Sequence, residues 1–159
     1  MRKQKTRGFT LLEILIVASI IMLLAVAGVV SYSSLNRSSR DARRKSDIEQ
    51  MRAAFEQWRS DYGSYPSVTV DCSVTSGLVS GSITYLATIP KDPQCTTRSY
   101  YYVTAAKADY VIAAALEIPP SPASCVSLPG GISVVGQCDD PGSTTPINCN
   151  YCVGPYGVR

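Results

Sequence analysis

The chain has 159 residues, 45% of them hydrophobic, a formal net charge of +3 and no histidine. The charge is unevenly distributed: the first seven residues carry four basic side chains and no acid, whereas residues 61–159 carry four basic and seven acidic ones, a net −3. The negative C-terminal part does not support nucleic-acid binding, and the lack of histidine excludes nucleophilic triads that need it.

A long apolar segment follows the basic N-terminus. In residues 9–30 the polar side chains are those of Thr10, Glu13 and Ser19. At about 1.5 Å per residue, a helix of this length spans the roughly 30 Å hydrocarbon layer of a membrane. The basic residues before it predict a cytoplasmic N-terminus and an exported remainder. A secretory signal peptide fits less well, because its apolar region is usually about 7 to 15 residues long. A plain membrane anchor is a second alternative.

Glu13 distinguishes these alternatives. A carboxylate in an apolar helix costs about 2.5 to 3.5 kcal/mol near the bilayer centre, so an intramembrane acid indicates a functional residue that needs a partner. The nearest new positive charge is the α-amino group that a cut just before Phe9 would create.

Residues 5–17, KTRGFTLLEILIV, resemble the N-terminal signature of type IV pilins and type II secretion pseudopilins. The resemblance implies that a prepilin peptidase in the membrane cuts after Gly8 and that Phe9 becomes the N-methylated first residue. It also implies that Glu13 pairs with the terminal amine of Phe9 in a neighbouring subunit. Such a pair sets the stagger between helices in a homo-oligomeric filament, which a pilus assembly platform builds from subunits held in the lipid bilayer.

The apolar segment continues into an amphipathic one. No proline occurs before Pro66 and no glycine between Gly28 and Gly63, so we predict one helix that ends within residues 61–66. Its core face is predicted to consist of Ile48, Met51, Phe55, Trp58 and Tyr62. The charged residues are expected on a solvated face: Arg37, Arg40, Asp41, Arg43, Arg44, Lys45, Asp47, Glu49, Arg52, Glu56 and Arg59.

Strand patterns follow the helix. Residues 99–104 and 109–117 are rich in aromatic and β-branched side chains and predict a hairpin, and residues 131–137 are a weaker strand candidate. Residues 85–93 resemble the Leu-Pro-x-Asp-Pro turn before the sheet of pseudopilins and Gram-positive-type pilins. The prediction is an α+β fold, in which a long N-terminal helix packs on a small antiparallel sheet followed by a disulfide-rich loop region. Alternation along residues 100–102 places at least one of the three tyrosines in the core and leaves the others for a binding surface.

The six cysteines are Cys72, Cys95, Cys125, Cys138, Cys149 and Cys152. An even number in an exported domain predicts disulfides, and six cysteines allow 15 pairings. We expect Cys72 to pair with Cys95 and the last four to pair among themselves.

The tail contains candidates for two other kinds of site. Cys149 and Cys152 have the spacing of a redox dithiol, and with Cys125 and Cys138 they could bind zinc, but neither a histidine nor a second Cys-x-x-Cys pair supports a metal site. Asp139 and Asp140 are weak candidates for calcium ligands, and two adjacent acids before Pro141 and Gly142 are more often simply part of a turn. We expect no cofactor and no resident metal.

The chain is thus predicted to consist of a leader (1–8), a membrane and assembly helix (9–30), an amphipathic helix (31–62) and a β-rich head (63–159). Many type IV pilins have a proline midway along the membrane helix, where this chain has Val30, and Gly28 is a weaker candidate for a bend. The long cysteine-rich tail also departs from the compact pseudopilin end. We therefore favour a non-enzymatic pilus subunit, first in the cytoplasmic membrane and then in a cell-surface filament. The alternatives are a secretion pseudopilin and a membrane-anchored exported thiol-disulfide protein.

Overall fold

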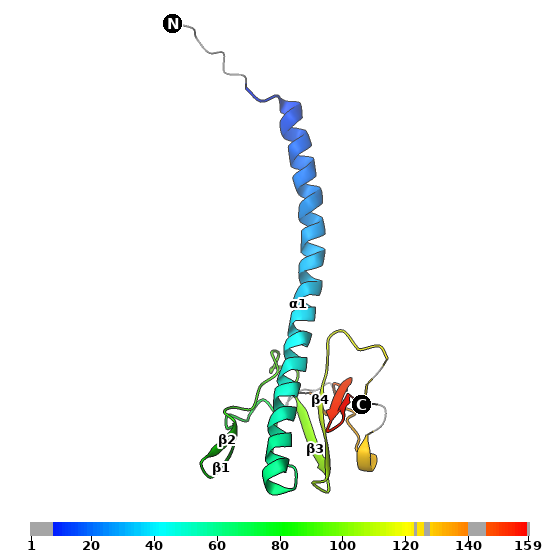
Figure 1. Cartoon of the computed structure of the whole chain (residues 1–159). Helices are drawn as coiled ribbons and strands as arrows, with labels where there is room; N and C mark the ends of the chain where they lie inside the picture. The colour runs from blue at the N-terminus through cyan, green and yellow to red at the C-terminus, as the bar shows by residue number, and fades with distance from the viewer. Residues whose placement is uncertain (1–7, 123, 126–127, 140–145, 159) are drawn as a thin grey trace. The chain divides into compact units, whose positions relative to one another are not determined.

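The computed structural model describes residues 8–122, 124–125, 128–139 and 146–158, without the side chains of residues 29–31. Residues 1–7 of the predicted leader and the calcium candidate Asp140 lie outside this part of the chain. By internal contacts the chain divides into two compact units, Met1–Arg37 and Ser38–Arg159. The elements, in chain order, are α1 (Leu11–Tyr62), β1 (Leu78–Ser80), β2 (Ile83–Leu86), β3 (Tyr101–Ala105), β4 (Asp109–Ala114), the 3-10 turn η1 (Pro129–Gly131), β5 (Tyr151–Gly154) and β6 (Gly157–Val158) (Figure 1).

In the first unit, α1 carries large apolar side chains that are exposed. Leu11 is 83% and Leu23 is 72% exposed, and α1 is long and apolar enough to cross a membrane by length and composition. The helix is continuous through Gly28. Exposing so much apolar surface is unfavourable in water but costs nothing in the hydrocarbon layer of a membrane.

In the second unit, α1 supplies one wall of the core. Ile48, Met51 and Phe55 are fully buried, as predicted, whereas Tyr62 is 49% exposed. The helix ends at the predicted place because Gly63 adopts a φ of +70° and donates its N–H to the carbonyl of Arg59 at 2.8 Å.

The head contains a four-stranded antiparallel sheet in the order β3-β4-β5-β6 and a separate β1-β2 hairpin. Alternate residues of β4 face two different clusters. Tyr110 and Ile112 join the core beneath α1, whereas Val111 and Ala113 join a cluster with cysteines of the tail. Strand β4 is therefore buried on both faces. The α+β prediction of a long helix on a small antiparallel sheet is confirmed.

Three details of the predicted head differ from the structure. The β3-β4 hairpin is present, but residues 131–137 are not a strand: Gly131 ends η1, and both Gly131 and Gly136 have positive φ angles that an extended strand does not allow. Residues 85 and 86 belong to β2 and not to a turn. The tail, expected to form loops, adds β5 beside β4, with Ala113 opposite Cys152.

Three disulfides close the head: Cys72–Cys95, Cys125–Cys152 and Cys138–Cys149. No cysteine is free. Two of the three bridges connect parts of the Pro-rich tail, where they restrict a segment that has little regular structure of its own.

Candidate functional site

The predicted processing and assembly residues lie at the start of α1. Thr10 precedes the first helical residue and forms a capping box with Glu13. The N–H and the hydroxyl of Thr10 donate to Oε2 of Glu13 at 2.8 and 2.9 Å, and the N–H of Glu13 donates to Oγ1 of Thr10 at 3.3 Å. Sequence reasoning gave Thr10 no role, although the Thr-x-x-Glu spacing is a capping signal.

This capping box uses only part of the Glu13 carboxylate. Both hydrogen bonds from Thr10 end on Oε2, and Oε1 has no hydrogen-bond partner among the described residues. Phe9, directly before the cap, is 84% exposed. The carboxylate is therefore held in a fixed position with one oxygen open to a further donor.

Gly8 has no internal steric reason to be glycine. A Cβ built at this position meets nothing within 4 Å. Among the described residues, a side chain at position 8 therefore meets no steric obstacle.

A buried polar cluster in the head, which we name the Arg44 cluster, consists of Arg40, Asp41, Arg44, Asp92 and Glu117. The side chain of Arg44 is 0% exposed and that of Asp92 is also 0% exposed. Two parallel hydrogen bonds, at 2.8 and 3.0 Å, join the guanidinium of Arg44 to the carboxylate of Asp92. The expectation that Arg44 and Asp41 lie on a solvated face was wrong.

The Arg44 cluster connects α1 to the end of the sheet. Nη1 of Arg44 donates to Asp41 at 2.8 Å and to Glu117 at 3.1 Å. Asp41 also accepts the backbone N–H groups of Glu117 and Ile118, at 2.9 and 2.8 Å. Arg40 donates to both oxygens of Glu117 at 2.6 Å. Each buried charge therefore has an opposite charge beside it, which is the condition for burying such groups.

These contacts shift pKa values within the cluster. Hydrogen bonds from Arg40 and, to a smaller extent, Arg44 lower the pKa of Glu117 from 4.5 to about 2 and outweigh the effect of burial, which raises it. Burial disfavours the charge on Arg44, but hydrogen bonds to Asp92, Glu117 and Asp41 outweigh it and raise the pKa of Arg44. Glu117 and Arg44 are therefore charged at neutral pH, and the cluster holds α1 on the head.

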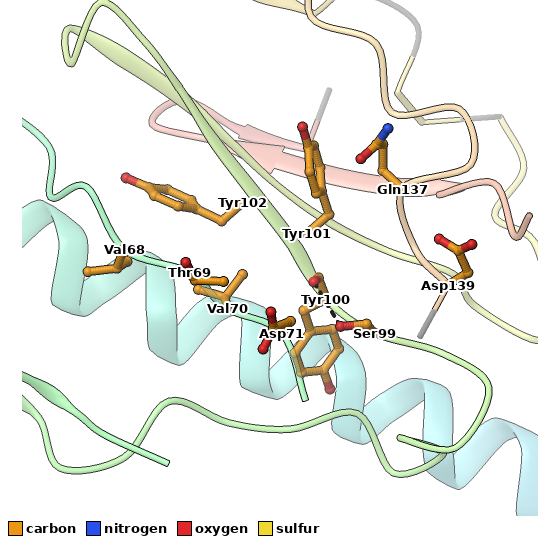
Figure 2. A pocket seen from close by; sticks show the side chains of 10 residues that line it. All are labelled: Val68, Thr69, Val70, Asp71, Ser99, Tyr100, Tyr101, Tyr102, Gln137 and Asp139. Atoms are coloured by element: carbon orange, nitrogen blue, oxygen red, sulfur yellow. Dashed lines mark hydrogen bonds between the residues drawn. The ribbon is translucent and has the colours of Figure 1, made fainter. Parts of the chain in front are cut away.

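The three consecutive tyrosines are divided by the pleat of the strand. Tyr100 is buried beneath α1, and its hydroxyl donates to Asp47 at 2.7 Å. Burial, and to a smaller extent this hydrogen bond, raises the pKa of Tyr100. Tyr102 donates to the carbonyl of Pro66 at 2.7 Å. Tyr101 lies on the other face, beside Gln137 (Figure 2). A cavity of about 310 Å³ lies against these residues.

The candidates in the tail are not brought together as a metal or redox site. Cys149 is bonded to Cys138 and Cys152 to Cys125, so the Cys-x-x-Cys pair does not bond internally. Asp139 forms an isolated backbone bridge with Arg98. Within the part of the chain that the structure describes, no group of three or more histidine, cysteine or acidic residues could hold a metal ion.

Comparison with known proteins adds one finding. A family model described as the prokaryotic N-terminal methylation motif matches residues 3–29. The match includes Gly8, Phe9, Thr10 and Glu13, and it confirms the resemblance seen in residues 5–17. No curated protein and no solved structure matches the chain.

Proposed function

We propose that this chain, which carries the signature shared by type IV pilins and pseudopilins, is a structural subunit of a type IV pilus-like filament. In this proposal a prepilin peptidase removes residues 1–8, Phe9 becomes N-methylated, and the mature subunits polymerise through α1. The subunit waits in the cytoplasmic membrane with its head outside, and an assembly platform adds it to the filament.

The proposal rests on the Glu13 carboxylate, of which only one oxygen accepts hydrogen bonds within the described chain. Thr10 holds Oε2 and leaves Oε1 without a partner among the described residues. Cleavage before Phe9 creates an amine, and the amine of a neighbouring subunit would satisfy the open oxygen. In an apolar bundle an unpaired charge costs several kcal/mol, so this pair selects one stagger between helices even if it adds little net stability.

The head supports a structural role over a catalytic one. All six cysteines are in disulfides, and Cys138 and Cys152 are fully buried. A thiol-disulfide enzyme needs an accessible thiol of lowered pKa. The bridges instead suit a head that has left the reducing cytoplasm.

The test replaces Glu13→Gln in the full-length chain, expressed with its own peptidase and assembly proteins. The glutamine carbonyl still accepts from Thr10, so the helix cap is kept while the charge is lost. We expect leader removal to continue and surface filaments, counted by electron microscopy, to disappear. Filaments in normal number would overturn the assembly role.

The matched control is Thr10→Ala, which removes the hydroxyl of the capping box and keeps the carboxylate. Such a cap is worth about 0.5 to 2 kcal/mol, little compared with the membrane anchoring of the helix. We expect filaments to persist. If this control lost filaments as completely as Glu13→Gln, helix capping and not the charge would explain the requirement for Glu13.

A further inference from the structure

Strand β3 is an edge strand without the usual protection. It is the terminal strand of the four-stranded sheet, and its sequence, Tyr-Tyr-Val-Thr-Ala, contains no charge and no proline. It pairs with β4 in continuous register from Tyr101 to Ala105, with no bulge. Exposed edges of this kind attract further strands, so folded proteins normally cover them or interrupt them with charges, proline or bulges.

A cavity, which we call the groove, lies against the first part of this edge, where Tyr101 and Tyr102 of β3 line it (Figure 2). The cavity, of about 310 Å³, is lined by residues 68–71, 99–102, Gln137 and Asp139. No backbone hydrogen bond joins residues 66–72 to β3 within the described chain. Just before β3 the tail is paired with this strand: the N–H of Ser99 donates to the carbonyl of Cys138 at 3.0 Å, beside the bridge between Arg98 and Asp139. Among the described residues, the edge is unpaired from Tyr100 to Ala105.

The walls of this groove are fixed in place. The hydroxyl of Tyr102 holds the carbonyl of Pro66 at 2.7 Å, and the Cys72–Cys95 disulfide anchors the other end of the segment. Val70 is buried in the core. Because the walls are tied down, the groove is preformed, which reduces the entropic cost of binding.

The geometry matches an added strand. In an antiparallel pair every second residue of an edge strand directs its N–H and C=O away from its neighbour. Five residues at about 3.3 Å each give β3 a length of about 16 Å. A bound strand would contact Tyr101 and Gln137 on one side of the groove and Val68 on the other. Recognition of this type takes affinity from main-chain hydrogen bonds and specificity from alternate side chains.

The charge of the groove indicates which kind of peptide it binds. Asp71 and Asp139 line it, and the lining residues that the structure describes include no lysine or arginine. Hydrogen bonds from the hydroxyl and the backbone N–H of Ser73 outweigh the opposing effect of burial and lower the pKa of Asp71, so Asp71 is ionised at neutral pH. Two copies of this chain paired edge to edge would bring these acids together. A basic segment complements them.

We propose that the free edge of β3 binds an extended, basic segment of a partner polypeptide as an added strand. The proposal concerns the head alone and does not depend on filament assembly.

The test uses the full-length, disulfide-intact chain in detergent micelles and a capped five-residue peptide of alternating valine and lysine. Nuclear magnetic resonance follows the backbone amides of residues 100–103 during titration. We expect these amides to shift in a saturable manner. A peptide with glutamate in place of lysine is expected to bind at least about tenfold more weakly, because its carboxylates face Asp71 and Asp139. Failure of the lysine peptide to shift these amides would overturn the proposal.

Two controls separate strand addition from other binding. A lysine peptide with alternate backbone nitrogens methylated, on the edge that faces β3, is expected to bind about tenfold more weakly or worse, since it cannot donate to β3. Asp139→Asn is expected to weaken binding of the unmodified peptide about two- to fivefold, whereas Glu49→Gln, the same charge change at a half-exposed position of α1 outside the groove, leaves binding unchanged.

Three outcomes would contradict strand addition by a basic segment. One is equal binding of the methylated peptide, and another is equal loss of affinity in Asp139→Asn and Glu49→Gln. The third is a shift of the β3 amides by maltose but not by the lysine peptide, which would assign the groove to a saccharide.

Discussion

Replacing Arg44→Met tests the idea that a buried charge cluster holds α1 on the head. Arg44 is 0% exposed and donates five hydrogen bonds, to Asp92, Asp41, Glu117 and Gln94. Methionine is unbranched and of related length, so it fills much of the space while removing every donor. The change leaves the fully buried carboxylate of Asp92 without its cation.

The expected magnitude follows from that unpaired charge. Removing one partner of a buried ion pair costs about 3 to 5 kcal/mol, because the remaining charge has lost its solvation and its partner. We therefore expect the free energy of unfolding to fall by about that amount. Arg40→Met is the matched control: its side chain is 33% exposed, water replaces the lost donor in part, and the loss should be clearly smaller.

The assay is urea unfolding of the full-length, disulfide-intact chain in detergent micelles, followed by the fluorescence of Trp58. This residue is the one tryptophan of the sequence, and its ring packs 4.6 Å from that of Tyr62 between centroids. Urea is preferred because it is uncharged and does not screen ion pairs. The double variant Arg44→Met with Asp92→Leu should regain part of the lost stability, since it removes the unpaired charge.

Either of two results would refute this reasoning. A loss below about 1 kcal/mol for Arg44→Met, equal to that of Arg40→Met, would show that the cluster contributes no more than a surface pair. No recovery in the double variant would show that the cost comes from packing and not from an unpaired carboxylate.

Two further predictions concern the head. The folded pKa of Glu117, about 2, lies below its usual 4.5 because of the hydrogen bonds from Arg40 and Arg44, so its contribution to stability is complete above pH 4.5 and is lost as the pH falls towards 2. The urea midpoint should therefore decrease over that range, and Glu117→Gln should flatten the decrease; an unchanged slope would contradict the pairing. Peptide mapping without reduction should recover the Cys125–Cys152 and Cys138–Cys149 bridges, and a bridge between residues 149 and 152 would contradict the fold of the tail.

The long helix was predictable because its signals are local. Apolar composition, the absence of internal proline and the Gly63 stop all act within a few residues of the position that they determine. The burial of Ile48, Met51 and Phe55 followed from their spacing alone.

The Arg44 cluster was missed because charge type was given more weight than position. Arg44 lies four residues before Ile48, and Asp41 lies three before Arg44, so both continue the buried face of α1. Periodicity therefore marked their burial. Nothing local identified Asp92, 48 residues further along the chain, as the partner that makes this burial possible.

Strand β5 was missed for a related reason. Tyr151–Gly154 is short and lies among prolines and glycines, which predict loops. Its place beside β4 depends on the bridge from Cys152 to Cys125 and on pairing with residues 112–114, both of which are distant in sequence. Long-range constraints of this kind leave little trace in a local pattern.

The central claim is that the carboxylate of Glu13 pairs with the α-amino group that leader removal creates at Phe9 of a neighbouring subunit. Mass spectrometry of the N-terminal peptide, taken from assembled protein on the cell surface, measures this amine directly. The account predicts a chain that begins at Phe9 and carries a methyl group on its α-nitrogen. Surface protein that still begins at Met1 would contradict it.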